Sequence, residues 1–276
     1  MDANENQAVK VAAVQMCSGS DRDANLATAA RLLAQAAGEG ARVAVLPENF
    51  AMMARHDAER RAIAEADGLG VIQQFLARTA QDLKLWIVGG TIPIHAPEDG
   101  RLAAACVVYD EHGARVARYD KIHLFDVDVP GPKESYRESA YMRPGGSVVV
   151  LDTPAGRLGL SVCYDMRFPE LYRALQAEGA QWFSIPSAFT VPTGRAHWET
   201  LLRARAIENL CYVVASGQCG THPNGRGTWG HSLIADYWGA VSAELAEGEG
   251  VVCAPIDLAA QAETRAKFPA LQHRVL

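Results

Sequence analysis

The sequence lacks the features that mark several broad classes of protein. Positive charge is not in excess, because the 276 residues carry a formal net charge of −6; this excludes the basic surface typical of proteins that bind nucleic acid or acidic membranes. No apolar run approaches the roughly 18 residues of a membrane-spanning helix, and the polar start MDANENQAVK has no apolar signal-peptide core. We therefore predict a cytoplasmic protein whose partners include neither nucleic acid nor a membrane.

Motifs for several common cofactors and nucleophiles are also missing. No GxxxxGK[ST] loop is present, and the glycine-rich residues 217–220 lack the strand–GxGxxG–helix pattern of a dinucleotide site. Neither the HExxH pattern of zinc peptidases nor the GxSxG turn of serine hydrolases occurs. The cysteines are widely spaced without a CxxC pair, so we expect reduced thiols rather than disulfides or structural zinc. The six are Cys17, Cys106, Cys163, Cys211, Cys219 and Cys253.

What the sequence does contain is a mixture of short apolar runs and longer segments with helical periodicity. Hydrophobic residues make up 49% and charged residues 21%, as in an ordinary globular protein. Many short strands mixed with a few long helices predict an α/β or α+β fold in layers, and the lack of linkers or repeats favours one domain. We expect strands at 9–16, 42–46, 85–88, 104–109, 115–119, 148–151, 157–162, 182–185, 211–215, 231–235 and 251–256. We expect helices at 21–37, 69–83, 168–178 and 195–208, an irregular loop at 120–146, and a tail at 257–276 with some helical character.

One stretch combines a buried strand, a cysteine and a helix start. The strand 158–162 stops at Cys163, and Pro169 suits the first turn of the helix that follows. A side chain at this corner can project past the sheet edge, close to the free N–H groups of a helix start, which favour a thiolate. The alternative is a buried structural cysteine, which is common.

Two charged residues share this placement directly after a strand. Glu48 follows the strand 42–46 and Pro47, and Lys121 follows the strand 115–119 in a chain with only five lysines. The alternatives are an exposed acid or helix cap for Glu48 and a solvated surface lysine for Lys121. Because binding crevices form beyond the carboxyl ends of strands, we expect both side chains beside Cys163. A carboxylate, an ammonium and a thiol are a base, an electrophilic clamp and a nucleophile, the set needed for acyl transfer.

The sequence around these three residues resembles a known family. The blocks are LPENF around Glu48, YDKIHLFD around Lys121 and LSVCYDMRFPELYRAL around Cys163. In this order and spacing they resemble the three signature blocks of the nitrilase superfamily of carbon–nitrogen hydrolases, and the resemblance extends over residues 9–273. It implies a four-layer α-β-β-α sandwich, one domain over residues 1–276, and a homodimer or higher homo-oligomer that assembles through helices and the C-terminal tail.

The resemblance also implies a role for each residue. Glu48 corresponds to the general base, Lys121 to the cationic stabiliser and Cys163 to the nucleophile. Family members have a further, supporting glutamate in the long loop, for which Glu138 matches best and Glu134 is the second candidate.

These roles predict a thioester mechanism without a metal or an organic cofactor. Glu48 takes the thiol proton as Cys163 attacks an amide carbonyl, and a free thiol needs such help because its pKa is near 8.5. Lys121 and the backbone N–H of Tyr164 hold the oxyanion. Glu48 then protonates the departing ammonia and activates water to release the acid. We expect burial to raise the pKa of Glu48 for this task.

The substrate implied by the resemblance is a small amide of a 2-oxo dicarboxylate. The chain resembles the Nit amidase branch, and QCG at 218–220 is more similar to members that hydrolyse deaminated glutathione than to ω-amidases of α-ketoglutaramate. A substrate carboxylate calls for a cation, and Arg167 is the first candidate, with an ion pair to Glu170 as the alternative. Arg195, where the branch commonly has proline, is the second. Phe189 is expected to line the pocket, although such aromatics are also core or dimer contacts.

Other functions remain open on the sequence alone. N-carbamoyl amidase and nitrilase activities use the same residues. A cysteine–histidine hydrolase would pair Cys163 with His123, His197 or His231. A non-catalytic binding protein could keep the same fold.

Overall fold

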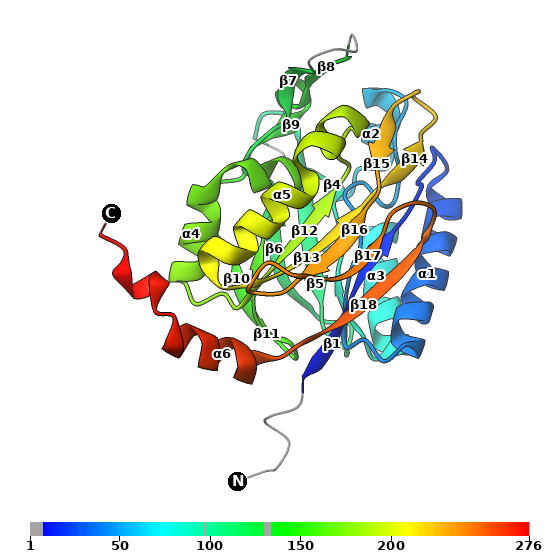
Figure 1. Ribbon diagram of the computed structural model, residues 1–276. Helices are drawn as coiled ribbons and strands as arrows, with labels where there is room; N and C mark the ends of the chain where they lie inside the picture. Colours follow the sequence, from blue (N-terminus) through cyan, green and yellow to red (C-terminus); the bar gives the residue numbers. More distant parts are fainter. Residues whose placement is uncertain (1–7, 97, 130–133, 276) are drawn as a thin grey trace.

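The computed structural model describes residues 8–96, 98–129 and 134–275. Two mixed β-sheets pack face to face, and helices cover the outer face of each sheet (Figure 1). The first sheet has the order β18-β1-β2-β3-β5-β4, with β6 and β9 also paired to β5, and the second has the order β10-β11-β12-β13-β16-β17. The predicted four-layer α-β-β-α sandwich is therefore confirmed.

The strands of the first sheet are β1 (Val9–Gln15), β2 (Val43–Val45), β3 (Trp86–Val88), β4 (Ile92–His95), β5 (Leu102–Tyr109), β6 (Arg115–Asp120), β9 (Met142–Arg143) and β18 (Gly250–Ile256). Those of the second are β10 (Val150–Thr153), β11 (Gly156–Leu160), β12 (Trp182–Ser187), β13 (Tyr212–Gly217), β16 (Ser232–Ala235) and β17 (Val241–Leu245). Two separate ribbons pair β7 (Asp126–Val129) with β8 (Glu134–Arg137), and β14 (Cys219–Thr221) with β15 (Gly227–Trp229). The α-helices are α1 (Arg22–Gly38), α2 (Asp57–Ala62), α3 (Val71–Leu83), α4 (Pro169–Ala177), α5 (Val191–Asn209) and α6 (Leu258–Lys267).

The layers follow from the alternation of apolar side chains along buried strands. In β1, Val11 and Ala13 belong to the core between the two sheets, while Ala12 and Val14 belong to the core under α1 and α3. Side chains on a strand point alternately to its two faces, so a strand that is apolar at every position must be covered on both sides. Helices α4 and α5 provide the matching cover for the second sheet, on the opposite side of the molecule (Figure 1).

One serine hydroxyl links the two sheets in the middle of their interface. Ser216, on β13 of the second sheet, donates through Oγ to the carbonyl of Val45 at 2.7 Å and accepts from the N–H of Val14 at 3.2 Å. Both partners lie in the first sheet, and all three groups are buried. A buried hydroxyl with satisfied partners fixes the register of one sheet on the other, since a shift would leave polar groups unpaired.

The prediction of an irregular loop at 120–146 was wrong. Its described part contains the ribbon β7–β8, a 3-10 turn η1 (Glu138–Ala140) and the short strand β9. Asp126 pairs with Arg137 and Val129 with Glu134, while residues 130–133 lie outside the described residues. Charged side chains alternate with others on this exposed ribbon, so the sequence has no apolar run to mark it.

The ribbons β7–β8 and β14–β15 lie at one end of the sandwich together with α2, and α6 lies at the other end (Figure 1). Helix α6 and the 3-10 turn η3 (Ala270–His273) account for the expected helical character of the tail. Within the described part of the chain, no helix combines the length and the apolar character needed to cross a membrane.

Candidate active site

The backbone packing at the end of β2 fixes the position of Glu48. Gly90 approaches so closely that a Cβ on it would stand 2.1 Å from the carbonyl oxygen of Pro47, and its φ of 53° suits glycine. Asn49 adopts a left-handed φ of 57° and donates its N–H to Thr91 Oγ1 at 2.9 Å. The chain therefore turns sharply around Glu48, and its side chain is directed into the molecule, where it is buried.

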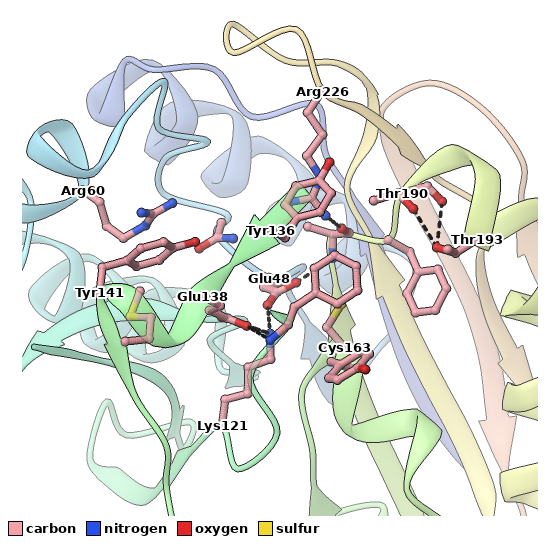
Figure 2. Close-up of a pocket in the computed structure, with 16 residues that line it drawn as sticks. Glu48, Arg60, Lys121, Tyr136, Glu138, Tyr141, Cys163, Thr190, Thr193 and Arg226 are labelled. Atoms are coloured by element: carbon pink, nitrogen blue, oxygen red, sulfur yellow. Dashed lines mark hydrogen bonds and ion pairs between the residues drawn. The ribbon is translucent and has the colours of Figure 1, made fainter. Parts of the chain in front are cut away.

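Lys121 extends from the end of β6 to the same place. Its N–H donates to Ala104 at 3.1 Å and its carbonyl accepts from Gly145 at 2.8 Å, so the backbone is held on both sides. The side chain is 2% exposed, and Nζ lies 2.8 Å from Glu48 Oε1 and 2.9 and 3.1 Å from the two oxygens of Glu138 (Figure 2). A buried ammonium thus lies between two carboxylates.

Glu138, rather than Glu134, is the second carboxylate beside Lys121. It lies on η1, and its Oε2 also accepts from the N–H of Phe125 at 2.6 Å. Glu134 lies on β8, where its Oε2 accepts from the hydroxyl of Tyr136. The structure therefore brings together the better-matching residue of the two.

Cys163 occupies a strained turn at the end of the second sheet. It follows β11 after two residues and begins the 3-10 helix η2 (Cys163–Arg167), so a 3-10 turn intervenes between the strand and α4. Its φ is 47°, in the left-handed region that non-glycine residues seldom adopt, at a cost of about 1–3 kcal/mol. Buried Asp165 holds this turn by accepting from the N–H of Val162 at 2.8 Å and from the hydroxyl of Tyr119 at 2.7 Å.

Glu48 also interacts with the segment that follows β12. Its Oε2 accepts from the N–H of Ala188 at 2.8 Å, while Gln218 donates to its backbone carbonyl at 3.1 Å. Ala188 and Gln218 follow strands of the second sheet, whereas Glu48 follows a strand of the first. The carboxylate is therefore fixed across the interface between the two sheets.

A single cavity is lined by all four of these residues. It encloses about 580 Å³, with open solvent at its mouth included, and Figure 2 shows Glu48, Lys121, Glu138 and Cys163 around its base. Its walls are mainly aromatic and hydroxyl side chains with two arginines. These are Arg60, Phe125, Tyr136, Tyr141, Tyr164, Phe189, Thr190, Thr193 and Arg226.

Burial and mutual attraction set the charges at the base of the cavity. Burial alone would lower the pKa of Lys121, but Glu138 and Glu48 attract the ammonium and raise its pKa well above the ordinary value. Burial would likewise raise the pKa of Glu48, but the attraction of Lys121 outweighs it and holds that pKa below the ordinary value. The expectation that burial raises the pKa of Glu48 was therefore wrong, because it ignored the ammonium beside it.

The thiol has the opposite tendency. Burial, reinforced by the negative charge of Glu48, raises the pKa of Cys163 to about 12, although Lys121 opposes this. At neutral pH the sulfur is thus a protonated thiol beside an ionised carboxylate. This pair can transfer a proton from sulfur to oxygen when a reaction consumes the thiolate.

Of the three predicted substrate-binding residues, only Phe189 lines the cavity. Arg167 lies next to it: its guanidinium is 5.1 Å from the Phe189 ring and 5.8 Å from the Tyr164 ring. Arg195 is exposed and lies in another surface pocket, over the ring of Trp229 at 6.0 Å. The reason is helical periodicity, because Gly194 and Trp198 form the buried face of α5 and Arg195 points away from it.

Sequence reasoning missed several lining residues, above all Arg60 and Arg226. Arg60 lies on α2, a short helix without buried residues, and Arg226 lies at the turn before β15. Neither position follows a buried strand or shows a periodic pattern. The one signal in the sequence that could have pointed to them is that they are arginines in segments to which no role had been assigned.

The three histidines proposed as partners for Cys163 have other contacts. His123 Nδ1 is 2.7 Å from Asp165, His231 Nδ1 is 2.6 Å from Glu244, and His197 Nδ1 is 3.3 Å from Arg167. Among the described residues none of the three lines the cavity. In the same part of the chain, no group of three or more His, Cys, Asp or Glu side chains is arranged to hold a metal ion.

Comparison with known proteins identifies relatives over nearly the whole chain. Residues 10–266 match the carbon–nitrogen hydrolase family. The deaminated glutathione amidase of Yersinia enterocolitica is 41% identical over 264 residues, covering 95% of this chain and 92% of that protein. The human protein of the same name is 42% identical over 268 residues, covering 96% and 81%. The crystal structure of Saccharomyces cerevisiae Nit3, a member of branch 10 of the nitrilase superfamily, superimposes with a TM-score of 0.87 at 32% identity, covering 98% of this chain and 97% of Nit3.

Proposed function

The chain belongs to the carbon–nitrogen hydrolase family, and we propose that within this family it is a deaminated glutathione amidase. It is a hydrolase that acts on carbon–nitrogen bonds other than peptide bonds. The relatives are named for deaminated glutathione, and the proposed substrate is accordingly this amide of a 2-oxo dicarboxylate. Since deaminated glutathione is an N-substituted amide, its leaving group is a dipeptide amine rather than ammonia.

The observation that carries this proposal is the ion cluster beside the thiol. Lys121 Nζ lies within 3.1 Å of both Glu48 and Glu138, and these residues line one cavity with Cys163. Two buried carboxylates around one ammonium leave one negative charge unmatched, which is unfavourable for folding. An arrangement that costs stability in this way is typical of a functional site. The cluster supplies a proton acceptor and a fixed positive charge at the sulfur.

In the first half of the proposed reaction, Cys163 attacks the amide carbonyl carbon. Its proton passes to the carboxylate of Glu48, so that a sulfur–carbon bond forms while the carbonyl electrons move to oxygen. One N–H of Lys121 and the N–H of Tyr164 stabilise this oxyanion. Tyr164 lies in the first turn of η2, where N–H groups have no partner within the helix. One such donor contributes about 3 kcal/mol to the transition state.

In the second half, Glu48 returns its proton to the nitrogen as the carbon–nitrogen bond breaks. The amine leaves and a thioester remains on Cys163. Glu48, again ionised, takes a proton from water, whose oxygen attacks the thioester carbonyl, and the thiolate leaves and is reprotonated. Glu138 keeps Lys121 charged and in place throughout.

Arg167 is the proposed partner of the 2-oxo acid carboxylate. Among the described residues no acid lies within ion-pair distance of it, so the alternative pairing with Glu170 is not formed. Burial lowers the pKa of this guanidinium, which remains charged, and an incoming carboxylate would supply its missing counter-ion. Its place over Phe189 puts the acyl end of the substrate on that side of the cavity.

The chain is also proposed to form a homodimer. Exposed apolar side chains of the turn between β16 and β17 and of the tail support this, since Trp238 packs at 5.4 Å on Phe268 and both remain about half exposed. Sedimentation equilibrium of the wild type tests it, and a monomer at micromolar concentration would contradict it.

The test of the activity is a panel of substrates with the formation of acid as the readout. Deaminated glutathione, α-ketoglutaramate, an N-carbamoyl amino acid and a simple nitrile are compared, and Cys163→Ala is the inactive control. The proposal expects the highest kcat/KM on deaminated glutathione. A preference for the nitrile or the carbamoyl compound, or activity that survives in the control, would overturn it.

A further inference from the structure

The cavity that contains Cys163 continues into a wider outer groove. The groove encloses about 960 Å³, solvent at its opening included, and four residues line both spaces: Arg60, Tyr136, Tyr141 and Arg226. These four side chains therefore form the passage between the reacting atoms and the surface. A group attached to the reacting nitrogen has to lie in this passage if the acyl group lies on the other side.

Arg226 has a charge without a partner of opposite sign. Its guanidinium donates to the carbonyl of Ala188 and lies 4.9 Å over the ring of Tyr136, but no described carboxylate lies within ion-pair distance. Its Nε is buried and has no acceptor among the described residues. A half-buried cation with this environment is stabilised by an anion that enters the passage.

Arg60 is on the other wall and has one loose ion pair, because its Nη1 is 3.6 Å from Oδ1 of Asp57, beyond hydrogen-bond distance. Its guanidinium lies 4.3 Å over the ring of Tyr141. The other oxygen of Asp57, Oδ2, accepts a hydrogen bond from Nε of Arg61 at 2.7 Å. Arg60 therefore keeps donors available toward the passage.

These two cations lie away from the proposed acyl subsite. Figure 2 shows Thr190 and Thr193 on one side of Cys163 and Arg60 with Tyr141 on the other, with Arg226 between them at the far end. Phe189, which supports Arg167, immediately precedes Thr190 in the chain. The molecule thus offers one cation to the acyl end of a substrate and two to the opposite end.

We propose that Arg60 and Arg226 bind a carboxylate on the leaving amine, so that the enzyme selects N-substituted amides with an anionic amine over primary amides. This rests on the proposed amidase function and adds a second recognition site to it. The guanidinium groups lie over the rings of Tyr136 and Tyr141, which attract the cations without using their N–H groups, and those donors suit a planar carboxylate. The reaction balances as before: the carbon–nitrogen bond breaks, the amine takes its proton from Glu48, and water supplies the new oxygen.

The test compares two substrates that differ only at the leaving amine. One is deaminated glutathione, and the other is the same compound with its C-terminal carboxylate converted to a carboxamide. For the wild type we expect kcat/KM to be about 10- to 100-fold higher on the acid, the size of one charge-assisted hydrogen bond, because the carboxamide loses the charge but keeps an oxygen that can accept. In the double variant R60M/R226M this ratio should fall to about one to three. The ratio removes any general effect of Arg226 on Glu48, because that effect acts on both substrates.

Arg78→Met is the matched control, because Arg78 is an exposed arginine on α3 that lines neither space and has no contact with Asp57 among those described. It should retain the wild-type ratio. A wild-type ratio near one overturns the proposal and needs no variant to fold, and a double variant that keeps the wild-type ratio overturns it as well. A wild type inactive on both compounds would instead reject the amidase function itself, so the two failures are distinguishable.

Discussion

Replacement of Glu138 by Gln tests whether this residue acts by keeping Lys121 charged. The carboxylate and the amide have the same size, so the change removes one negative charge at 2.9 Å from Nζ and little else. If the amide oxygen keeps the N–H of Phe125, the amide nitrogen must stand where Oε1 now lies, 3.1 Å from Nζ. Two donors would then face each other in a buried site.

The expected size of the effect follows from this geometry. Removal of one partner from a buried ion pair costs about 3–5 kcal/mol, and because Glu48 still pairs with Lys121 we expect the lower end. That cost is one of folding stability; the rate falls because a displaced or neutral Lys121 no longer stabilises the oxyanion, and loss of one such donor should lower kcat/KM about 100-fold near pH 7. Since Glu138 is the strongest cause that raises the pKa of Lys121 and burial opposes it, that pKa should fall in Glu138→Gln.

The assay is the pH profile of kcat/KM for hydrolysis of deaminated glutathione. The alkaline limb should move to lower pH in Glu138→Gln and return toward the wild type in Glu138→Asp, which restores the charge. Asp128→Asn is the control, because Asp128 is an exposed acid on the adjacent ribbon and pairs only with exposed Arg137 at 3.0 Å among the described residues. Wild-type kcat/KM with an unmoved alkaline limb in Glu138→Gln would refute the reasoning.

Three further results are expected. Glu48→Gln should lower kcat by about 10²- to 10⁴-fold, as for loss of a general base, and activity within threefold of the wild type would argue for another proton acceptor. In urea titrations, the stability that ionised Glu48 contributes should be fully present above pH 4.5 and lost as the pH falls through its lowered pKa. The stability that charged Lys121 contributes should be fully present below pH 10.5 and lost as the pH rises through its raised pKa. Urea midpoints of a Glu48→Gln variant that equal those of the wild type at both pH 3 and pH 7 would contradict this. Gly90→Ala should lower both the activity and the free energy of unfolding, the latter by about 2 kcal/mol or more, because the new Cβ would clash with the carbonyl of Pro47. In the control Gly146→Ala, whose Cβ would meet nothing within 4 Å, the free energy of unfolding should stay within about 0.5 kcal/mol of the wild type. Equal urea midpoints for the two variants would disprove the clash.

The positions of Glu48, Lys121 and Cys163 were predictable because each lies within three residues of the end of a strand. What the strand pattern does not contain is the pairing of the sheets. Glu48 and Lys121 follow β2 and β6 of the first sheet, whereas Cys163 follows β11 of the second, so they meet across the sandwich rather than along one sheet edge. Only the resemblance to a family implied that two sheets are involved.

The remaining errors have local physical causes. The ribbon β7–β8 has only a short apolar stripe, which Val127, Val129 and Tyr136 form, and the alternation DVDV was too brief to mark a strand within a charged segment. Arg195 was chosen because it replaces a proline, but its place on α5 relative to Trp198 already directed it outward. Arg60 and Arg226 are identified only by the space between them, which arises from segments more than 160 positions apart in the chain.

The hydrogen bonds of the Ser216 hydroxyl have a consequence for how this enzyme should lose activity. Because the sulfur and its proton acceptor belong to different sheets, catalysis depends on the alignment of the two sheets, which the Ser216 hydroxyl fixes through Val45 and Val14. A small displacement of one sheet relative to the other would abolish activity while circular dichroism still records intact strands. Turnover is therefore a more sensitive measure of how the two sheets are aligned than circular dichroism, which records the strands alone.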